Sequence, residues 1–94
     1  MIGHLHIPEL GEGWHNTYEK KSGVDIMRLE NPSLNLYVEI DLRARTLCAW
    51  RKSEGKILCL ERFDSRMTFC DAFVMTKNIA RDEKNRNQCS TIIR

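Results

Sequence analysis

Large aliphatic residues occupy every second position of the segment 34–42, LNLYVEIDL. A period of two places such residues on one face of a β-strand, whereas a helix would scatter them around its circumference. The segment therefore predicts a strand with one face buried in a core. The aliphatic positions are Leu34, Leu36, Val38, Ile40 and Leu42, and the opposite face carries Asn35, Tyr37, Glu39 and Asp41.

Turn signals divide the rest of the first two thirds of the chain into further short strands. Lys21-Ser22-Gly23 and Ser53-Glu54-Gly55 offer glycines for tight hairpins, and Pro32 stops the strand before it. The strands predicted are 14–20, 24–30, 34–42, 46–52 and 56–62. The last contains ILCL, which is apolar on both faces and predicts a central strand covered by a helix. Residues 1–13 predict an irregular arm with a short strand within 2–7.

An amphipathic helix is predicted over residues 64–82. Asp64 and Ser65 are good N-cap residues, and apolar residues follow at three- and four-residue spacings. Beyond Ala80 the chain becomes polar, so residues 83–94 predict a polar tail that could add a short edge strand or bind a partner. The fold class expected is α+β, a single domain in which an antiparallel β-meander of four to five strands packs on one C-terminal α-helix.

The core expected from these elements draws on both the sheet and the helix. Its predicted members are Leu34, Leu36, Val38, Ile40, Leu47 or Cys48, Ile57 or Leu58, Leu60, Met67, Phe69, Cys70, Phe73 and Val74. Trp50 and Tyr18 fit either the core or an interface.

Charge is distributed unevenly along the chain of 94 residues. Residues 1–40 carry six acids and three bases, while residues 41–94 carry seven acids and twelve bases. Such polarity suits an acidic partner, but scattered solvated charges give the same count, and no five bases run together as in a nucleic-acid-binding tail. There is no apolar run of about 18 residues and no signal-peptide pattern, so a cytoplasmic protein without membrane contact is expected.

Metal and cysteine chemistry find little support in the spacing of the candidate residues. Cys48, Cys59 and Cys70 stand eleven residues apart in apolar stretches, unlike the closely spaced ligands of zinc sites, and they predict reduced core thiols. His4 and His6 would share one side of a strand, which suits surface histidines better than a metal site. Apolar surroundings raise a thiol's pKa and oppose nucleophilic catalysis.

Acid–base and phosphate chemistry find no better support. Glu39 and Asp41 are expected about 7 Å apart on one strand face. Two solvated surface carboxylates have the same spacing as a catalytic pair, so the pattern does not indicate catalysis. Gly11-Glu12-Gly13 lacks the pattern of a phosphate-binding loop. We expect no enzyme activity, no cofactor and no metal.

The outward face of the sheet then becomes the candidate functional surface. The predicted partner-binding residues are Tyr37, Arg43, Arg45, Arg51 and Trp14. Aromatic residues flanked by arginines are typical of interface hot spots, which predicts a small protein-binding regulator or inhibitor. Unpaired edge strands could also join two copies into a dimer. Compact chains without motifs are common among proteins that phages and mobile elements direct at host machinery.

A single-stranded nucleic-acid-binding module is the alternative. Such modules present aromatics and bases from an uncovered sheet face, and Tyr37 with the sheet arginines could serve. Glu39 and Asp41 on the same face would repel phosphates, which favours protein over nucleic acid as the partner.

Overall fold

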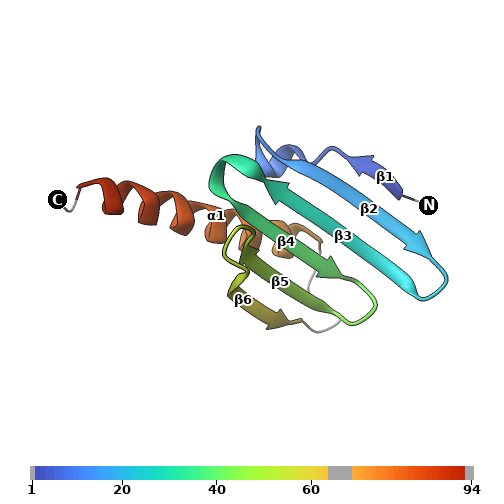
Figure 1. Ribbon diagram of the computed structural model, residues 1–94. Helices are drawn as coiled ribbons and strands as arrows, with labels where there is room; N and C mark the ends of the chain where they lie inside the picture. Colours follow the sequence, from blue (N-terminus) through green and yellow to red (C-terminus); the bar gives the residue numbers. More distant parts are fainter. Residues whose placement is uncertain (1, 64–68, 93–94) are drawn as a thin grey trace.

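The sheet contains six antiparallel strands, each paired with the next strand in the chain (Figure 1). In the computed structural model the described residues are 2–63 and 69–92. The strands are β1 (Ile2–Leu5), β2 (His15–Lys21), β3 (Val24–Asn31), β4 (Leu36–Asp41), β5 (Thr46–Arg51) and β6 (Lys56–Arg62). One long helix, α1 (Phe69–Ile92), follows, and two 3-10 turns, η1 (Pro8–Leu10) and η2 (Pro32–Leu34), interrupt the meander. The predicted α+β class, a meander with one C-terminal helix packed against it, is confirmed.

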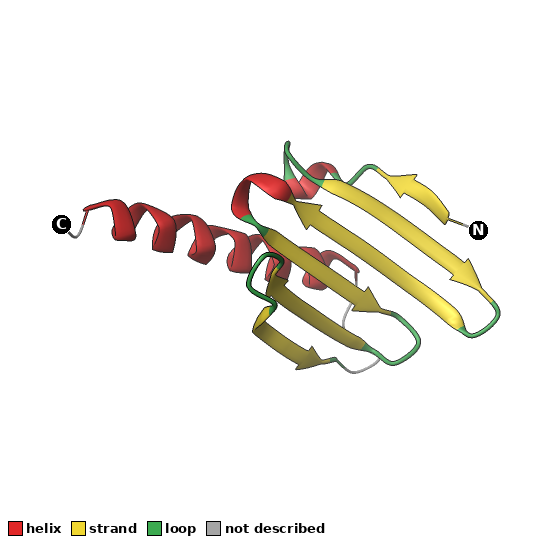
Figure 2. Ribbon diagram, viewed as in Figure 1, coloured by secondary structure: helices red, strands yellow, loops and turns green. Residues whose placement is uncertain are grey.

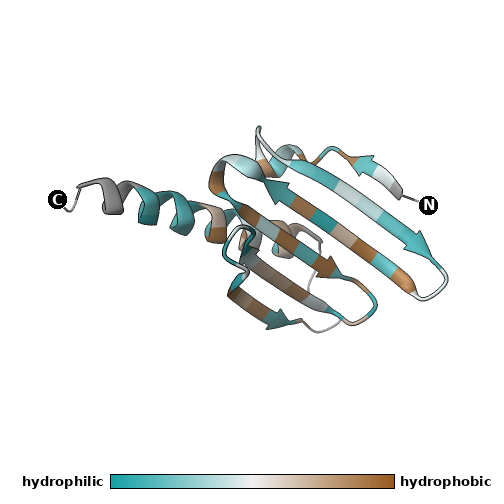
Figure 3. Cartoon of the chain, viewed as in Figure 1, coloured by the Kyte–Doolittle hydropathy of each residue, from teal (hydrophilic) through white to brown (hydrophobic). Residues whose placement is uncertain are grey.

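One face of the sheet holds the core, as the alternation in 34–42 predicted. Leu36, Val38 and Ile40 are at most 1% exposed, and their cross-strand neighbours Leu29 and Leu47 are fully buried. Figure 3 shows the alternation of apolar and polar residues along β3 and β4. Because side chains alternate across a strand, this burial fixes the register of the central strands. We call this the covered face and its opposite the open face.

The helix lies behind the sheet and covers this face with a stripe of small residues (Figures 1 and 2). Ala72 and Thr76 are buried against the sheet, and the Thr76 hydroxyl donates a hydrogen bond to the Ala72 carbonyl at 2.9 Å. Phe73 and Ile79 pack beside them. The C-terminal part of α1 extends past the sheet (Figure 1). No helix in the part of the chain described here combines the length and apolar character that a membrane crossing requires.

Strand β4 is shorter than the predicted strand 34–42 because a 3-10 turn precedes it. The Asn31 side chain accepts a hydrogen bond from the Leu34 amide at 3.2 Å, and Asn35 adopts a left-handed conformation with φ 55°. Leu34 therefore lies outside the strand, Leu42 follows its last residue, and both pack against the core.

The prediction that ILCL forms a central strand buried on both faces is wrong. Strand β6 is the edge of the sheet, with Ile57 60% and Leu60 65% exposed. A register irregularity between β5 and β6 places Leu58 and Cys59 against the core, so the apolar character of both faces reflects a bulge and not two covering layers. Cys48 points to the open face beside Leu60, which leaves Leu47 as the core member.

The helix also differs from its prediction at both ends. Cys70 and Val74, expected in the core, are exposed. Asp64, Ser65 and Met67 lie outside the described residues, and so does the side chain of Phe69. Toward the C-terminus, the chain from Glu83 to Ile92 continues the helix, so the suggested edge strand there is wrong.

The short strand predicted within residues 2–7 is present, and the rest of the N-terminal segment is more ordered than the irregular arm predicted for residues 1–13. Residues 2–5 form strand β1, which pairs with β2, and η1 follows. Ile7 and Leu10 are buried in the core beside the helix. Pro8 supplies the fixed φ that suits the first position of the turn.

Candidate functional site

The open face of the sheet is arranged in three cross-strand rows fixed by the register. One row runs His15, Glu30, Tyr37, Trp50, Ile57; the next runs Thr17, Arg28, Glu39, Cys48, Leu60; the third runs Glu19, Ile26, Asp41, Thr46, Arg62. Apolar side chains gather at the β5–β6 side of the first two rows, while charged side chains gather over β2 to β4. The face is therefore divided into two chemically different halves.

The apolar half forms a continuous patch that reaches the sheet edge. We define the apolar patch as Tyr37, Cys48, Trp50, Ile57 and Leu60. The Tyr37 and Trp50 rings pack with centroids 4.6 Å apart and planes tilted by 36°. Burial, and then the nearby Glu39 carboxylate, raises the pKa of the Tyr37 hydroxyl. Burial likewise raises the pKa of the Cys48 thiol, which keeps it protonated and apolar.

The charged half is held together by ion pairs. Arg28 lies 2.8 Å from one Glu19 oxygen and 3.9 Å from Glu39, and Lys21 lies 3.3 Å from Glu19. A hydrogen bond from Arg28 and one from Lys21 lower the pKa of Glu19. Lys52 pairs with Glu30 at the end of β3. The cations over β2 to β4 are thus already matched by carboxylates of the same face.

The five residues predicted to bind a partner do not come together. Tyr37 lies on the open face, as expected. Arg43 and Arg45 are exposed in the β4–β5 turn, beyond Asp41, which is itself about 13 Å along the strand from Tyr37 at about 3.3 Å per residue. Trp14 precedes β2 and packs against the core.

The placement of Arg51 on the open face is wrong. Its register partner is Leu36, which puts the side chain on the covered face. There its Nε and Nη2 atoms donate to the two carboxylate oxygens of Glu83 in α1, at 2.9 and 3.1 Å. Glu54 lies 3.3 Å from the outer side of the guanidinium. Arg51 therefore joins the sheet to the helix through its ion pair with Glu83, and its role is structural.

Sequence reasoning missed Ile57 and Leu60 and left Trp50 open. Leu60 was predicted in the core, and Ile57 was the alternative there to Leu58, because a bulge cannot be read from apolar residues in sequence. The position of Trp50 could have been found from the hairpin: a turn centred on residues 43 and 44 pairs Trp50 with Tyr37 on one face.

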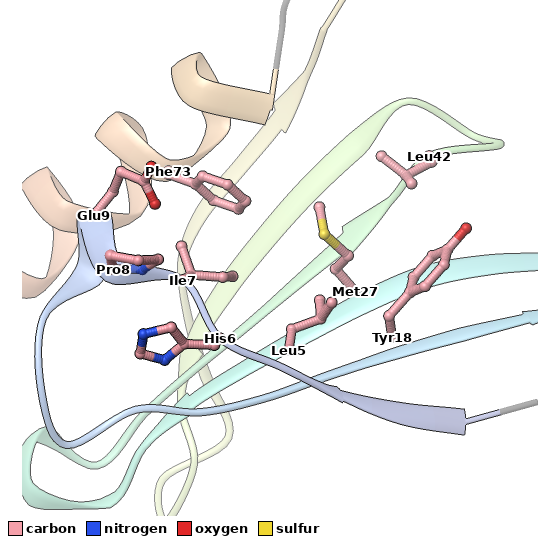
Figure 4. Close-up of a pocket in the computed structure, with 9 residues that line it drawn as sticks. All are labelled: Leu5, His6, Ile7, Pro8, Glu9, Tyr18, Met27, Leu42 and Phe73. Atoms are coloured by element: carbon pink, nitrogen blue, oxygen red, sulfur yellow. The ribbon is translucent and has the colours of Figure 1, made fainter.

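A cavity of about 450 Å³ lies at the other side of the molecule, between the N-terminal segment and the covered face (Figure 4). Leu5, Ile7, Met27 and Phe73 line it together with the Tyr18 ring. The Tyr18 hydroxyl donates a hydrogen bond to Asp25, and that bond, together with burial, raises the tyrosine's pKa. Tyr18 is thus a core residue with a polar tip, and the cavity lining is predominantly apolar.

Of the two carboxylates considered as a catalytic pair, Asp41 has a structural role. The Asp41 carboxylate accepts hydrogen bonds from the backbone amides of Arg43 and Ala44, at 3.0 and 2.9 Å, and thereby caps the β4–β5 turn. Across residues 2–63 and 69–92, no three histidine, cysteine or acidic side chains cluster closely enough to hold a metal ion. Asp41 acts in local structure, which weakens its reading as one of a catalytic pair with Glu39.

The open face thus combines an aromatic pair, two exposed aliphatic side chains and a rim of paired charges. These features suit contact with a macromolecule better than chemical conversion of a small one. Comparison of the chain with known protein families, with curated proteins and with solved structures found no match.

Proposed function

We propose that this protein is a small protein-binding module that acts through the apolar patch on the open face. The observation that carries the proposal is the exposure of Ile57 and Leu60, 60% and 65%, beside the packed rings of Tyr37 and Trp50. Contiguous apolar surface of this kind is costly in water and marks interaction sites. Aromatic anchors surrounded by polar residues are the usual centre of a protein interface.

The charge arrangement favours a protein over a single-stranded nucleic acid as the partner. Arg28 and Lys52, which could meet phosphates on the open face, already pair with Glu19 and Glu30. Binding a phosphate backbone would need these pairs to break, with the carboxylates left facing negative charge. Tyr37 and Trp50 pack on each other, which leaves less ring surface for base stacking.

A module that acts without catalysis would occupy or mask a surface of its partner. The proposal is accordingly a non-enzymatic regulator or inhibitor. The charged rim over β2 to β4 would orient the partner and influence its association rate, while the apolar patch would supply most of the affinity.

Photo-crosslinking on the native protein tests this proposal. A photoreactive amino acid in place of Ile57 should capture a defined protein from the source cell's lysate, and the same amino acid in place of Lys77 on the helix should not. Leu60→Asp should abolish the capture, because a buried carboxylate in the interface is costly. Val74→Asp is the matched control, since Val74 is 54% exposed but lies on the helix.

Two outcomes would contradict the proposal. Capture that is equal with Leu60→Asp and Val74→Asp would show that the patch is not the contact surface. Retention on immobilised single-stranded DNA that falls steeply with salt would favour the nucleic-acid alternative, since counterion release gives such binding its salt dependence.

A further inference from the structure

Strand β6 forms one edge of the sheet and differs in length and side chains from the strand at the opposite edge. Strand β1 is four residues long, whereas β6 has seven residues and carries the exposed side chains Ile57 and Leu60. Among the described residues no strand pairs with the outer side of β6. An open edge templates pairing with another chain, and natural proteins oppose this with short strands, bulges or inward-pointing charges. Strand β6 has a bulge and the charges of Lys56 and Glu61, so pairing requires a register in which these charges attract each other.

The bulge gives β6 an unusual distribution of side chains between the two faces. Ile57 lies opposite Trp50 and Leu60 lies opposite Cys48, so both point to the open face although they are three positions apart. Lys56 lies opposite Arg51 and Glu61 opposite Leu47, so both point to the covered face. Without the bulge, residues separated by an odd number of positions would point to opposite faces.

We propose that a second copy of this chain pairs antiparallel with β6 about a two-fold axis near its middle. Placing Lys56 of one copy opposite Glu61 of the other also places Ile57 opposite Leu60, with every pair on a common face. The two-fold repeats both contacts, giving two ion pairs and two aliphatic pairs. Cross-strand pairs of each kind stabilise antiparallel sheets.

Neighbouring registers of the same strand are less favourable. Moving the partner by one residue would place Lys56 on the covered face opposite Arg62 on the open face, and Ile57 on the open face opposite Glu61 on the covered face. The side chains of each pair would then point to opposite faces of the sheet, so neither the ion pairs nor the aliphatic pairs would form. The charge pattern of β6 is therefore self-complementary in one register, which argues for a second copy as its occupant.

This arrangement would double the sheet and join the two apolar patches. Ile57 and Leu60 of both copies would lie at the centre, with each Tyr37–Trp50 pair on either side. The inference does not depend on the proposed partner, because the edge could pair in the purified protein alone. If both hold, the partner would dock across the two-fold axis.

Charge exchange at the edge tests the inference in the intact chain. Sedimentation velocity over a wide concentration range should show a reversible dimer for the wild type. Lys56→Glu and Glu61→Lys should each weaken dimerisation by at least about tenfold, because each places two like-charge contacts in the dimer and 1.4 kcal/mol corresponds to a factor of ten. Both side chains are exposed, so the folded protomer should be retained, as circular dichroism would check.

Two rescue arms make the test specific. The double variant Lys56→Glu with Glu61→Lys should dimerise like the wild type, and an equimolar mixture of the two single variants should form a heterodimer. A wild type that stays monomeric, single variants that dimerise normally, or a failure of both rescues would overturn the inference.

The failure of this inference is distinguishable from failure of the proposed function. Trp50→Ala lies one strand inside the edge, so it should reduce partner capture and leave the dimer intact. If the wild type is monomeric but capture of the partner still depends on Trp50, the dimer is refuted and the proposed function stands. If the dimer passes the rescue tests but no partner is captured, the dimer stands and the proposed function is refuted.

Discussion

Replacing Glu83 by leucine should lower the free energy of unfolding by about 3 kcal/mol. The Glu83 side chain is 8% exposed and that of Arg51 11%, and two hydrogen bonds of 2.9 and 3.1 Å join them. Removing one partner of a buried pair costs about 3–5 kcal/mol, because the remaining charge stays desolvated. Glu54 remains 3.3 Å from Arg51 after the change, which puts the expected cost at the lower end.

Urea denaturation of a double-mutant cycle measures this effect. Glu83→Leu and Arg51→Met should each be strongly destabilising, whereas the double variant should recover most of the loss, because it leaves no buried charge; Glu54 and Arg86, which lose a partner, are exposed. For a domain of this size the total stability is about 5–14 kcal/mol, so a loss of 3 kcal/mol moves the midpoint clearly. Single variants within about 0.5 kcal/mol of the wild type, or strictly additive effects, would refute the reasoning.

The same ion pair should make stability depend on pH. The hydrogen bond from Arg51 lowers the pKa of Glu83 below its usual value of 4.5 in the folded state. The folded state then binds the proton less tightly than the unfolded state, so the stabilisation is present above the unfolded pKa and is lost as the pH falls through the folded pKa. The wild type should lose more stability on acidification than Glu83→Gln, and equal losses would count against this linkage.

Three further changes probe other parts of the fold. Leu47→Ala should cost about 2–5 kcal/mol because Leu47 is fully buried, whereas Leu60→Ala should cost less than about 0.5 kcal/mol; equal shifts in urea midpoint would contradict the assigned faces. Arg45 has φ 58°, so Arg45→Val should be less stable than Arg45→Gly by more than about 1 kcal/mol in thermal unfolding. Exposed Cys70 should react with iodoacetamide faster than Cys48, whose pKa burial raises, and the reverse order by mass spectrometry would argue against this orientation of the helix.

The parts of the fold that sequence predicted are those in which one face is buried. Alternation in 34–42 identified β4 because Leu36, Val38 and Ile40 all enter the core. The end of α1 escaped prediction because the helix there extends beyond the sheet, and the polar run RDEKNRNQ has no apolar periodicity that would mark a helix.

The candidate site was harder to predict than the fold, because it depends on pairing between strands. The face of Arg51 follows from its register with Leu36, which composition does not reveal. The exposure of Ile57 depends on a bulge and on β6 having no further neighbour among the described residues, and both are properties of the whole sheet.

The meander order has a consequence for how the chain reaches its structure. Every strand pairs with its immediate successor, so each hairpin closes a short loop at a small entropic cost. The Arg51–Glu83 contact, 32 residues apart in sequence, closes a much longer loop and should form after the hairpins. Sheet topologies with such local pairing fold faster than those built from distant segments. During synthesis, the hairpins could form in turn as they emerge, and docking of the helix would complete the core last.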